Sequence, residues 1–104
     1  MIRKELKYTI PIIKEDNSNF WLRYSIIHFP SSLYGVAVEL YKYSDNFSEF
    51  VSDSTPPLTY SYDEILRICE FISINTVTPI TLCTIIDSMD IDLGESKKST
   101  IMSV

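Results

Sequence analysis

The fold is decided by residues 61–89, which read SYDEILRICEFISINTVTPITLCTIIDSM. Ser61 and Glu64 form the pattern of a capping box, in which side chains satisfy the free amide groups at a helix start. Thr78 and Pro79 form a second helix start, because proline presets the helical φ at a first position. Apolar residues then recur at the spacing of a helix face. We therefore predict helices over about residues 62–74 and 79–89.

The residues before this stretch alternate between apolar and polar side chains, as half-buried strands do. The alternation predicts strands near residues 6–12, 20–29, 33–43 and 47–52. The side chains expected to face the core are Leu6, Tyr8, Ile10 and Ile12, then Phe20, Leu22, Tyr24, Ile26 and His28, then Val36, Val38 and Leu40. Pro11 favours an edge position for the first strand. The sequence therefore predicts an α+β fold, an antiparallel meander of about four strands packed on two C-terminal helices.

The chain of 104 residues has the composition of one globular domain, with 45% hydrophobic and 22% charged residues. We expect a single domain over residues 1–94 and a C-terminal tail over residues 95–104. The apolar runs are too short to span a membrane, and the N-terminus has no signal-peptide pattern. Cys69 and Cys83 fall in the two predicted helices and do not indicate a secreted disulfide framework. These features predict a cytoplasmic protein without a membrane partner.

The two halves of the chain differ in charge. Residues 1–43 carry six basic and four acidic side chains. Residues 44–95 carry ten acids and one base, Arg67, which makes this half strongly acidic. Direct nucleic-acid binding requires clustered Lys and Arg with interleaved aromatics, and the sequence has no such cluster. We therefore expect no direct contact with nucleic acid, whereas a basic protein partner suits the acidic half.

The sequence argues against catalysis. His28 is the single histidine, and we expect it to be partly buried and hydrogen-bonded on the inward strand face. One histidine and two distant cysteines lack the spacing of a zinc site. The acids from Asp87 to Glu95 lack the register of a calcium loop, and the two glycines form no phosphate-binding loop. We predict no enzyme activity, no metal and no cofactor.

The outer face of the predicted sheet is the first candidate binding surface. Its side chains include Trp21, Arg23, Tyr41 and Tyr43. Trp, Tyr and Arg dominate the hot spots of protein interfaces. The alternative is that the fourth strand, the N-terminus or the tail covers these aromatics. The acidic end of the second helix, with Asp87, Asp90 and Asp92, is the second candidate surface.

A resemblance to a known family rests on the strand at residues 34–39, the acidic turn at Asp53, the helix at residues 64–71 and above all residues 75–87, NTVTPITLCTIID. Over residues 33–89 the chain resembles a family of small uncharacterised proteins from spore-forming anaerobic bacteria. The family pattern is similar to N-x-V-x-P-x-H-L. Thr81 stands where that pattern has a histidine, so no role of the histidine is carried over. The resemblance implies the strand-then-two-helix layout and a bacterial origin, and it adds no mechanism.

Two classes of function remain. The first is a non-enzymatic bacterial interaction protein, a regulator or inhibitor that binds a protein partner and forms a homodimer. A narrower form is a phage-encoded inhibitor of a host defence nuclease, similar to an anti-CRISPR protein, whose acidic half occupies a groove meant for nucleic acid. The second class is a small-ligand binding or enzymatic domain with a pocket between sheet and helices, near Tyr24, His28 and Cys69.

Overall fold

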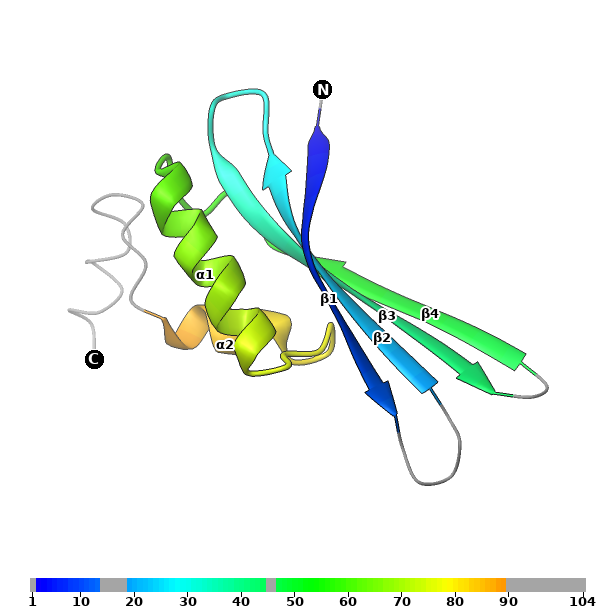
Figure 1. The fold of residues 1–104 in the computed structure, drawn as a ribbon. Helices are drawn as coiled ribbons and strands as arrows, with labels where there is room; N and C mark the ends of the chain where they lie inside the picture. Colours follow the sequence, from blue (N-terminus) through cyan, green and yellow to red (C-terminus); the bar gives the residue numbers. More distant parts are fainter. Residues whose placement is uncertain (1, 14–18, 45–46, 90–104) are drawn as a thin grey trace.

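The computed structural model describes residues 2–13, 19–44 and 47–89. It contains a four-stranded antiparallel sheet in the order β1-β2-β3-β4, followed by two helices (Figure 1). The strands are β1 (Arg3–Ile13), β2 (Asn19–His28), β3 (Tyr34–Ser44) and β4 (Phe47–Ser54), and the helices are α1 (Tyr62–Ile74) and α2 (Leu82–Ser88). The predicted α+β meander with two C-terminal helices is confirmed. The predicted tail, residues 95–104, lies outside the described residues.

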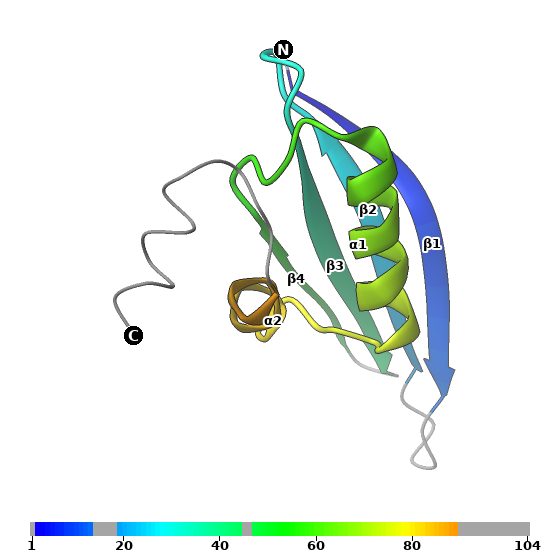
Figure 2. The same ribbon diagram turned by 90° about the vertical axis from the view of Figure 1, so that its left-hand side faces the viewer.

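Both helices lie on the same side of the sheet, which we call the inner face; the opposite side is the outer face (Figure 2). Fully buried side chains of β2 and β3 meet buried side chains of both helices on the inner face. These core residues are Leu22, Tyr24, Ile26, Val36, Val38, Ile65, Ile72 and Leu82. The Tyr24 hydroxyl donates a hydrogen bond of 2.9 Å to the Val77 carbonyl, which connects β2 to the loop between the helices. The inward alternation predicted for β2 and β3 is thus confirmed.

α1 begins at the predicted position, with the Ser61 half of the predicted capping box formed and Thr59 placed between Glu64 and the Ser61 amide. The Ser61 hydroxyl oxygen accepts a hydrogen bond of 3.1 Å from the Glu64 amide. The Thr59 hydroxyl donates a hydrogen bond to the Glu64 carboxylate. The same Thr59 oxygen accepts a hydrogen bond of 3.1 Å from the Ser61 amide. The predicted apolar stripe, Ile65, Ile68, Cys69 and Ile72, is buried. The entrance of α1 is therefore fixed by side chains of the preceding loop.

α2 is shorter than predicted. It begins at Leu82 rather than at Pro79, because residues 78–82 form a tighter turn. In this turn the Thr81 amide bonds to the Thr78 carbonyl at 3.1 Å and the Leu82 amide to the Pro79 carbonyl at 3.4 Å. Such three-residue spacing is typical of a tight turn at a helix start. Thr78 and Pro79 therefore lie just before a helix, but the helix begins three residues after Pro79.

β1 contains an irregularity that the alternation of its sequence does not reveal. The pairing with β2 shifts between Leu6 and Tyr8, as in a β-bulge. Leu6 pairs with Ser25 of the outer face and is 46% exposed. The prediction that Leu6 faces the core is therefore wrong, and Glu5, which pairs with Ile26, takes the inward position. The edge position predicted from Pro11 is confirmed, since β1 is an edge strand of the sheet.

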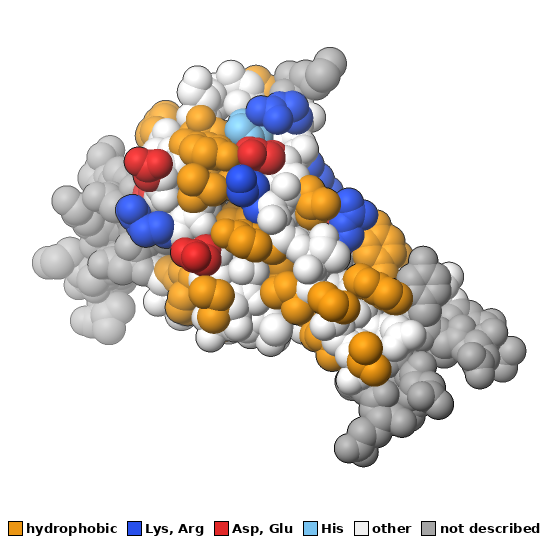
Figure 3. All heavy atoms as spheres, viewed as in Figure 1, with side chains coloured by type: hydrophobic (Ala, Val, Ile, Leu, Met, Phe, Trp, Pro, Cys, Tyr) orange, Lys and Arg blue, Asp and Glu red, His pale blue; other side chains and the backbone are white. Residues whose placement is uncertain are grey.

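The helical layer is shorter than the sheet. The 13 residues of α1 extend about 20 Å, whereas the 11 residues of β1 extend about 37 Å. The end of the sheet where β1 and β3 finish and β2 and β4 begin therefore projects beyond the helices (Figure 1). In the space-filling view, hydrophobic side chains continue along this projecting part (Figure 3). A hollow of about 250 Å³ lies at the boundary, lined by Ile12, Phe20, Leu22, Leu40, Thr76 and Thr78.

Candidate functional site

The strand register places four ring-bearing residues in one line across the outer face. Pro11 pairs with Trp21, Trp21 pairs with Tyr41, and Tyr41 pairs with Phe50. We call this line of Pro11, Trp21, Tyr41 and Phe50 the aromatic row. The Tyr41 and Phe50 rings lie 4.9 Å apart between centroids, and Phe50 is 52% exposed. One residue from every strand thus contributes a ring to the same strip of surface.

Arg23 lies beside the aromatic row, in the next cross-strand line. Its Nη1 donates a hydrogen bond of 3.4 Å to the Tyr41 hydroxyl, and its guanidinium carbon lies 5.7 Å from the Tyr41 ring centroid. Glu39 lies 4.0 Å from the Arg23 Nε and 3.7 Å from the Lys4 ammonium. The carboxylate therefore offsets part of the positive charge here, and the contact with Tyr41 holds the guanidinium against the ring face.

A hollow of about 580 Å³ opens at this point of the outer face. It is lined by Asn19, Trp21, Arg23 and Tyr41. Three of the four sheet residues predicted for partner binding therefore line one concave site. The fourth, Tyr43, pairs through its backbone with Asn19 in the neighbouring line, and its side chain lies outside the described part of the structure. Sequence reasoning did not find Asn19, Pro11 or Phe50, because their placement depends on strand register.

The outer face is open at the aromatic row but closed near the other end of the strands. There Ser25, Ile27 and Ala37 are at most 4% exposed. Gly35 permits this closure, since a Cβ atom at its position would lie 2.8 Å from the Thr55 hydroxyl and 3.0 Å from both the Phe29 ring and the Pro56 carbonyl. Phe29 and residues 55–56 therefore cover this end of the outer face, whereas Trp21 and Tyr41 are partly exposed within the described residues. The tail, one of the coverings predicted for the aromatics, lies outside the described residues.

The predicted acidic surface is separated from the aromatic row. Asp87 is exposed on α2, in the layer that covers the inner face. Asp90 and Asp92 lie outside the described residues. The sheet residues and Asp87 therefore occupy different layers of the protein and do not form one site.

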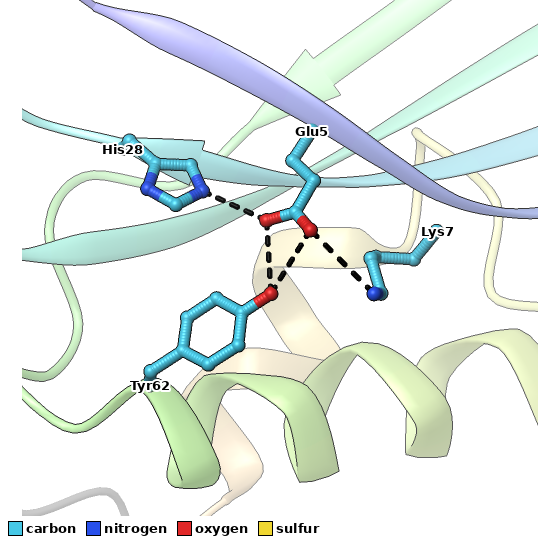
Figure 4. Close-up of polar contacts among 4 residues, drawn as sticks. All are labelled: Glu5, Lys7, His28 and Tyr62. Atoms are coloured by element: carbon cyan, nitrogen blue, oxygen red, sulfur yellow. Dashed lines mark hydrogen bonds and ion pairs between the residues drawn. The ribbon is translucent and has the colours of Figure 1, made fainter.

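A second polar site, on the inner face, joins β1, β2 and α1 (Figure 4). Nε2 of His28 lies 2.8 Å from Oε1 of Glu5. The Tyr62 hydroxyl donates to both carboxylate oxygens, at 2.9 and 3.0 Å, and the Lys7 ammonium lies 3.5 Å from Oε2. The Tyr34 ring packs edge-on against His28 and Tyr62, with centroids 5.3 and 5.4 Å away. One carboxylate thus organises a cluster that we call the Glu5 cluster.

The electrostatics of the Glu5 cluster favour an ionised carboxylate. The hydrogen bond with His28 is the largest cause that lowers the pKa of Glu5, and burial opposes it. The hydrogen bond with Tyr62 and the charge of Lys7 add to the lowering, so the pKa lies below its ordinary value. The bond to Glu5 raises the pKa of Tyr62, because a phenolate would face the carboxylate. Both oxygens of Glu5 are occupied by these partners. The arrangement therefore holds three elements together, and the predicted hydrogen-bonded state of His28 is confirmed.

The groups proposed for a ligand pocket near His28 are closed within the core. Tyr24 and Cys69 are both 0% exposed, and burial raises the pKa of each side chain to about 12. The Cys69 thiol therefore stays protonated and is not an activated nucleophile. Cys83 is exposed and free, and its thiol lies 3.5 Å from the Asp53 carboxylate. Burial and this carboxylate raise its pKa as well.

The fold and these two sites define a small α+β domain with an open aromatic sheet face and a closed helical face. Residues 3–91 match the model of a family of unknown function, DUF6514, and the chain belongs to this family. The match supports the prediction of an uncharacterised domain, and it extends beyond residues 33–89. No curated protein and no solved structure matches the chain. Within the described residues, no helix is long and apolar enough to cross a membrane.

Proposed function

We propose that this protein is a non-enzymatic binding protein that engages a protein partner through the outer face of its sheet. The observation that carries the proposal is the aromatic row, with its hollow lined by Asn19, Trp21, Arg23 and Tyr41. Aromatic and arginine side chains set around a concave site supply contact area at low cost in conformational entropy.

A protein partner fits the charges of this face better than nucleic acid does. The positive groups described near the aromatic row, Arg23 and Lys4, both contact Glu39. Binding to a phosphate backbone needs a surplus of cationic side chains along its path. The surface around Trp21 instead combines rings with two cations that share the Glu39 carboxylate, which suits a partner that presents apolar side chains and a small number of polar groups.

The position of the aromatic row also supports a binding role. An aromatic strip on a monomer surface is costly to leave in water, and larger exposed apolar patches mark interaction sites. The other face of the same strands packs against α1 and α2, so that binding at Trp21 requires no opening of the core. We therefore propose a preformed site on a rigid sheet, used to regulate or inhibit the bound protein in the bacterial cytoplasm, in a spore-forming host.

The acidic half of the chain supports a narrower version of this proposal. Residues 44–95 carry ten acids and one base, and Asp87 is exposed on α2. A phage-encoded inhibitor of a defence nuclease would present such an acidic surface to a basic groove. In this version a basic partner contacts the helical layer, and the aromatic row is a separate anchor.

A pull-down from the native host tests which surface binds. The bait is the full chain, compared with Trp21→Ala/Tyr41→Ala and with Asp87→Lys. We expect a stoichiometric partner, identified by mass spectrometry, that is lost with the aromatic pair and retained with Asp87→Lys. Loss with the charge reversal alone supports the nuclease-inhibitor version instead.

The matched control is Tyr60→Ala/Phe71→Ala, which removes two exposed aromatics away from the aromatic row. This variant should retain the partner as well as wild type does. A partner lost equally from both aromatic pairs would contradict a site at Trp21, because the binding would then follow general hydrophobicity. Thermal unfolding of each bait confirms that the compared proteins are folded.

A further inference from the structure

The two edges of the sheet differ in their protection against pairing with another strand. β1 carries the bulge between Leu6 and Tyr8, has Pro11 within the strand, and bears Lys4 and Lys7. Bulges, prolines and lysines are the devices by which proteins keep an edge strand from pairing. β4, whose sequence is FSEFVSDS, has no proline, lysine or register shift. Within the described residues, the β4 edge is therefore open to a further strand.

The backbone groups available on the β4 edge follow from one hydrogen bond. The Thr55 amide donates to the Val36 carbonyl of β3 at 2.9 Å, so odd-numbered residues of β4 turn toward β3 and even-numbered residues turn to the open edge. Among the even-numbered residues, the Ser54 amide already donates to the Asp53 carboxylate at 2.9 Å. The amides still directed outward along the described edge belong to Ser48, Phe50 and Ser52.

We propose that β4 pairs antiparallel with β4 of a second copy of this chain, with Phe50 opposite Phe50 of the partner subunit. Ser48 then lies opposite Ser52 of the partner subunit, and each such pair exchanges two backbone hydrogen bonds. The self-complementary edge gives a two-fold dimer with closed symmetry. The inference rests on the edge strand and does not depend on the proposed partner at Trp21.

Charge and hydrogen bonding select this register over its neighbours. Moving the partner strand in one direction places Glu49 opposite Asp53 of the partner subunit. That register also needs the Ser54 amide as a donor to the partner strand, and this amide already donates to the Asp53 carboxylate of its own chain. A shift in the other direction places Glu49 opposite Glu49 of the partner subunit. Like charges directly opposite each other destabilise a strand pair. In the proposed register, Glu49 instead faces Val51 of the partner subunit.

The same register joins the two aromatic rows. Phe50 ends the aromatic row at the β4 edge, and pairing with Phe50 of the partner subunit extends the row across both sheets. Because residues directly opposite in an antiparallel pair share a face, the two outer faces lie on the same side of the dimer. The second copy also covers Phe50, which is 52% exposed in the single chain.

The mass in solution gives the first test. Wild type should sediment as a dimer, at twice the 12.0 kDa of the chain. Ser52→Pro removes an amide that faces the open edge and takes no part in the β3 pairing, so it should reduce the mass to that of one chain. Ser52→Ala keeps the amide and should remain a dimer. Monomeric wild type, or a Ser52→Pro variant that is still dimeric, would overturn the proposal.

Cysteine cross-linking tests the register without relying on the proline variant. In a Cys83→Ser background, Phe50→Cys should form a disulfide-linked dimer on mild oxidation, since hydrogen-bonded partners lie about 5.5 Å apart between Cα atoms. Ser48→Cys should stay unlinked, because the two copies of that position lie more than about 13 Å apart along the strands. Ser48→Cys/Ser52→Cys should link again. The register would be contradicted if the two single variants linked equally. It would also be contradicted if neither Phe50→Cys nor the double variant formed a linked dimer.

Discussion

The two faces of the sheet are built from alternate residues of the same strands, yet they serve different purposes. On the inner face, Leu22 and Val38 are at most 1% exposed beneath the helices. On the outer face, their neighbour Trp21 lines an open hollow, and Glu39 lies 4.0 Å from Arg23, which lines the same hollow. The difference teaches that the helices determine which face stabilises the domain. The uncovered face is the one that we propose for recognition, and its large aromatic side chains lie outside the core beneath the helices.

The largest expected effect comes from the adjacent pair Leu22 and Trp21, which point to opposite faces. Leu22→Ala should reduce the free energy of unfolding by about 2–5 kcal/mol, because it leaves a cavity in the core. Trp21→Ala should reduce it by less, since the ring is partly exposed and lines the open hollow. Urea unfolding measures both values. Similar losses for the two variants would contradict the division between the faces.

A smaller effect is expected where the outer face is closed. Gly35→Ala should destabilise the protein by about 1–3 kcal/mol, because the added carbon meets the Pro56 carbonyl and the Phe29 ring at 3.0 Å. Ser25→Ala, on the same face and without such a clash, serves as the control. Unchanged unfolding of Gly35→Ala would show that the residue 55–56 segment does not need to approach β3 this closely.

The smallest effect concerns the Glu5 cluster and depends on pH. Glu5→Gln should cost about 1 kcal/mol at neutral pH through weaker bonds to His28 and Tyr62. The pKa of Glu5 is lowered by folding, so its contribution is complete above the ordinary value of 4.5 and disappears as the pH falls through the folded-state pKa. Unfolding of both proteins across the acid range should show the difference closing there. A difference that persists at the lowest pH would contradict the assigned role.

The sequence predicts those parts of the fold that depend on local chemistry. The Ser61 cap, the apolar stripe of α1 and the alternation of β2 and β3 all appear as predicted. The outward positions of Trp21, Arg23 and Tyr41 follow from the same alternation. These features need only neighbouring residues and a knowledge of which face is buried.

The features that the sequence does not predict depend on pairing between distant residues. Phe50 enters the aromatic row only through the β3–β4 register, and Glu5 reaches His28 only because β1 contains a bulge. Neither is visible in the periodicity of a single strand. The tight turn before Leu82 is the local exception. Thr78 and Pro79 are typical of a helix start, but the first hydrogen bonds after them span three residues and form a turn before the helix begins.

The bulge in β1 also changes which positions of the strand face the core, and therefore which positions tolerate substitution. Before Lys7 the inward positions are odd-numbered, Arg3 and Glu5, and after it they are even-numbered, Tyr8, Ile10 and Ile12. Relatives that keep this bulge should therefore vary most freely at even positions in the first part of β1 and at odd positions in the second. Removal of Lys7, the extra residue of the bulge, would restore a regular alternation that keeps Leu6 outward and Glu5 inward, so Glu5 would still face His28.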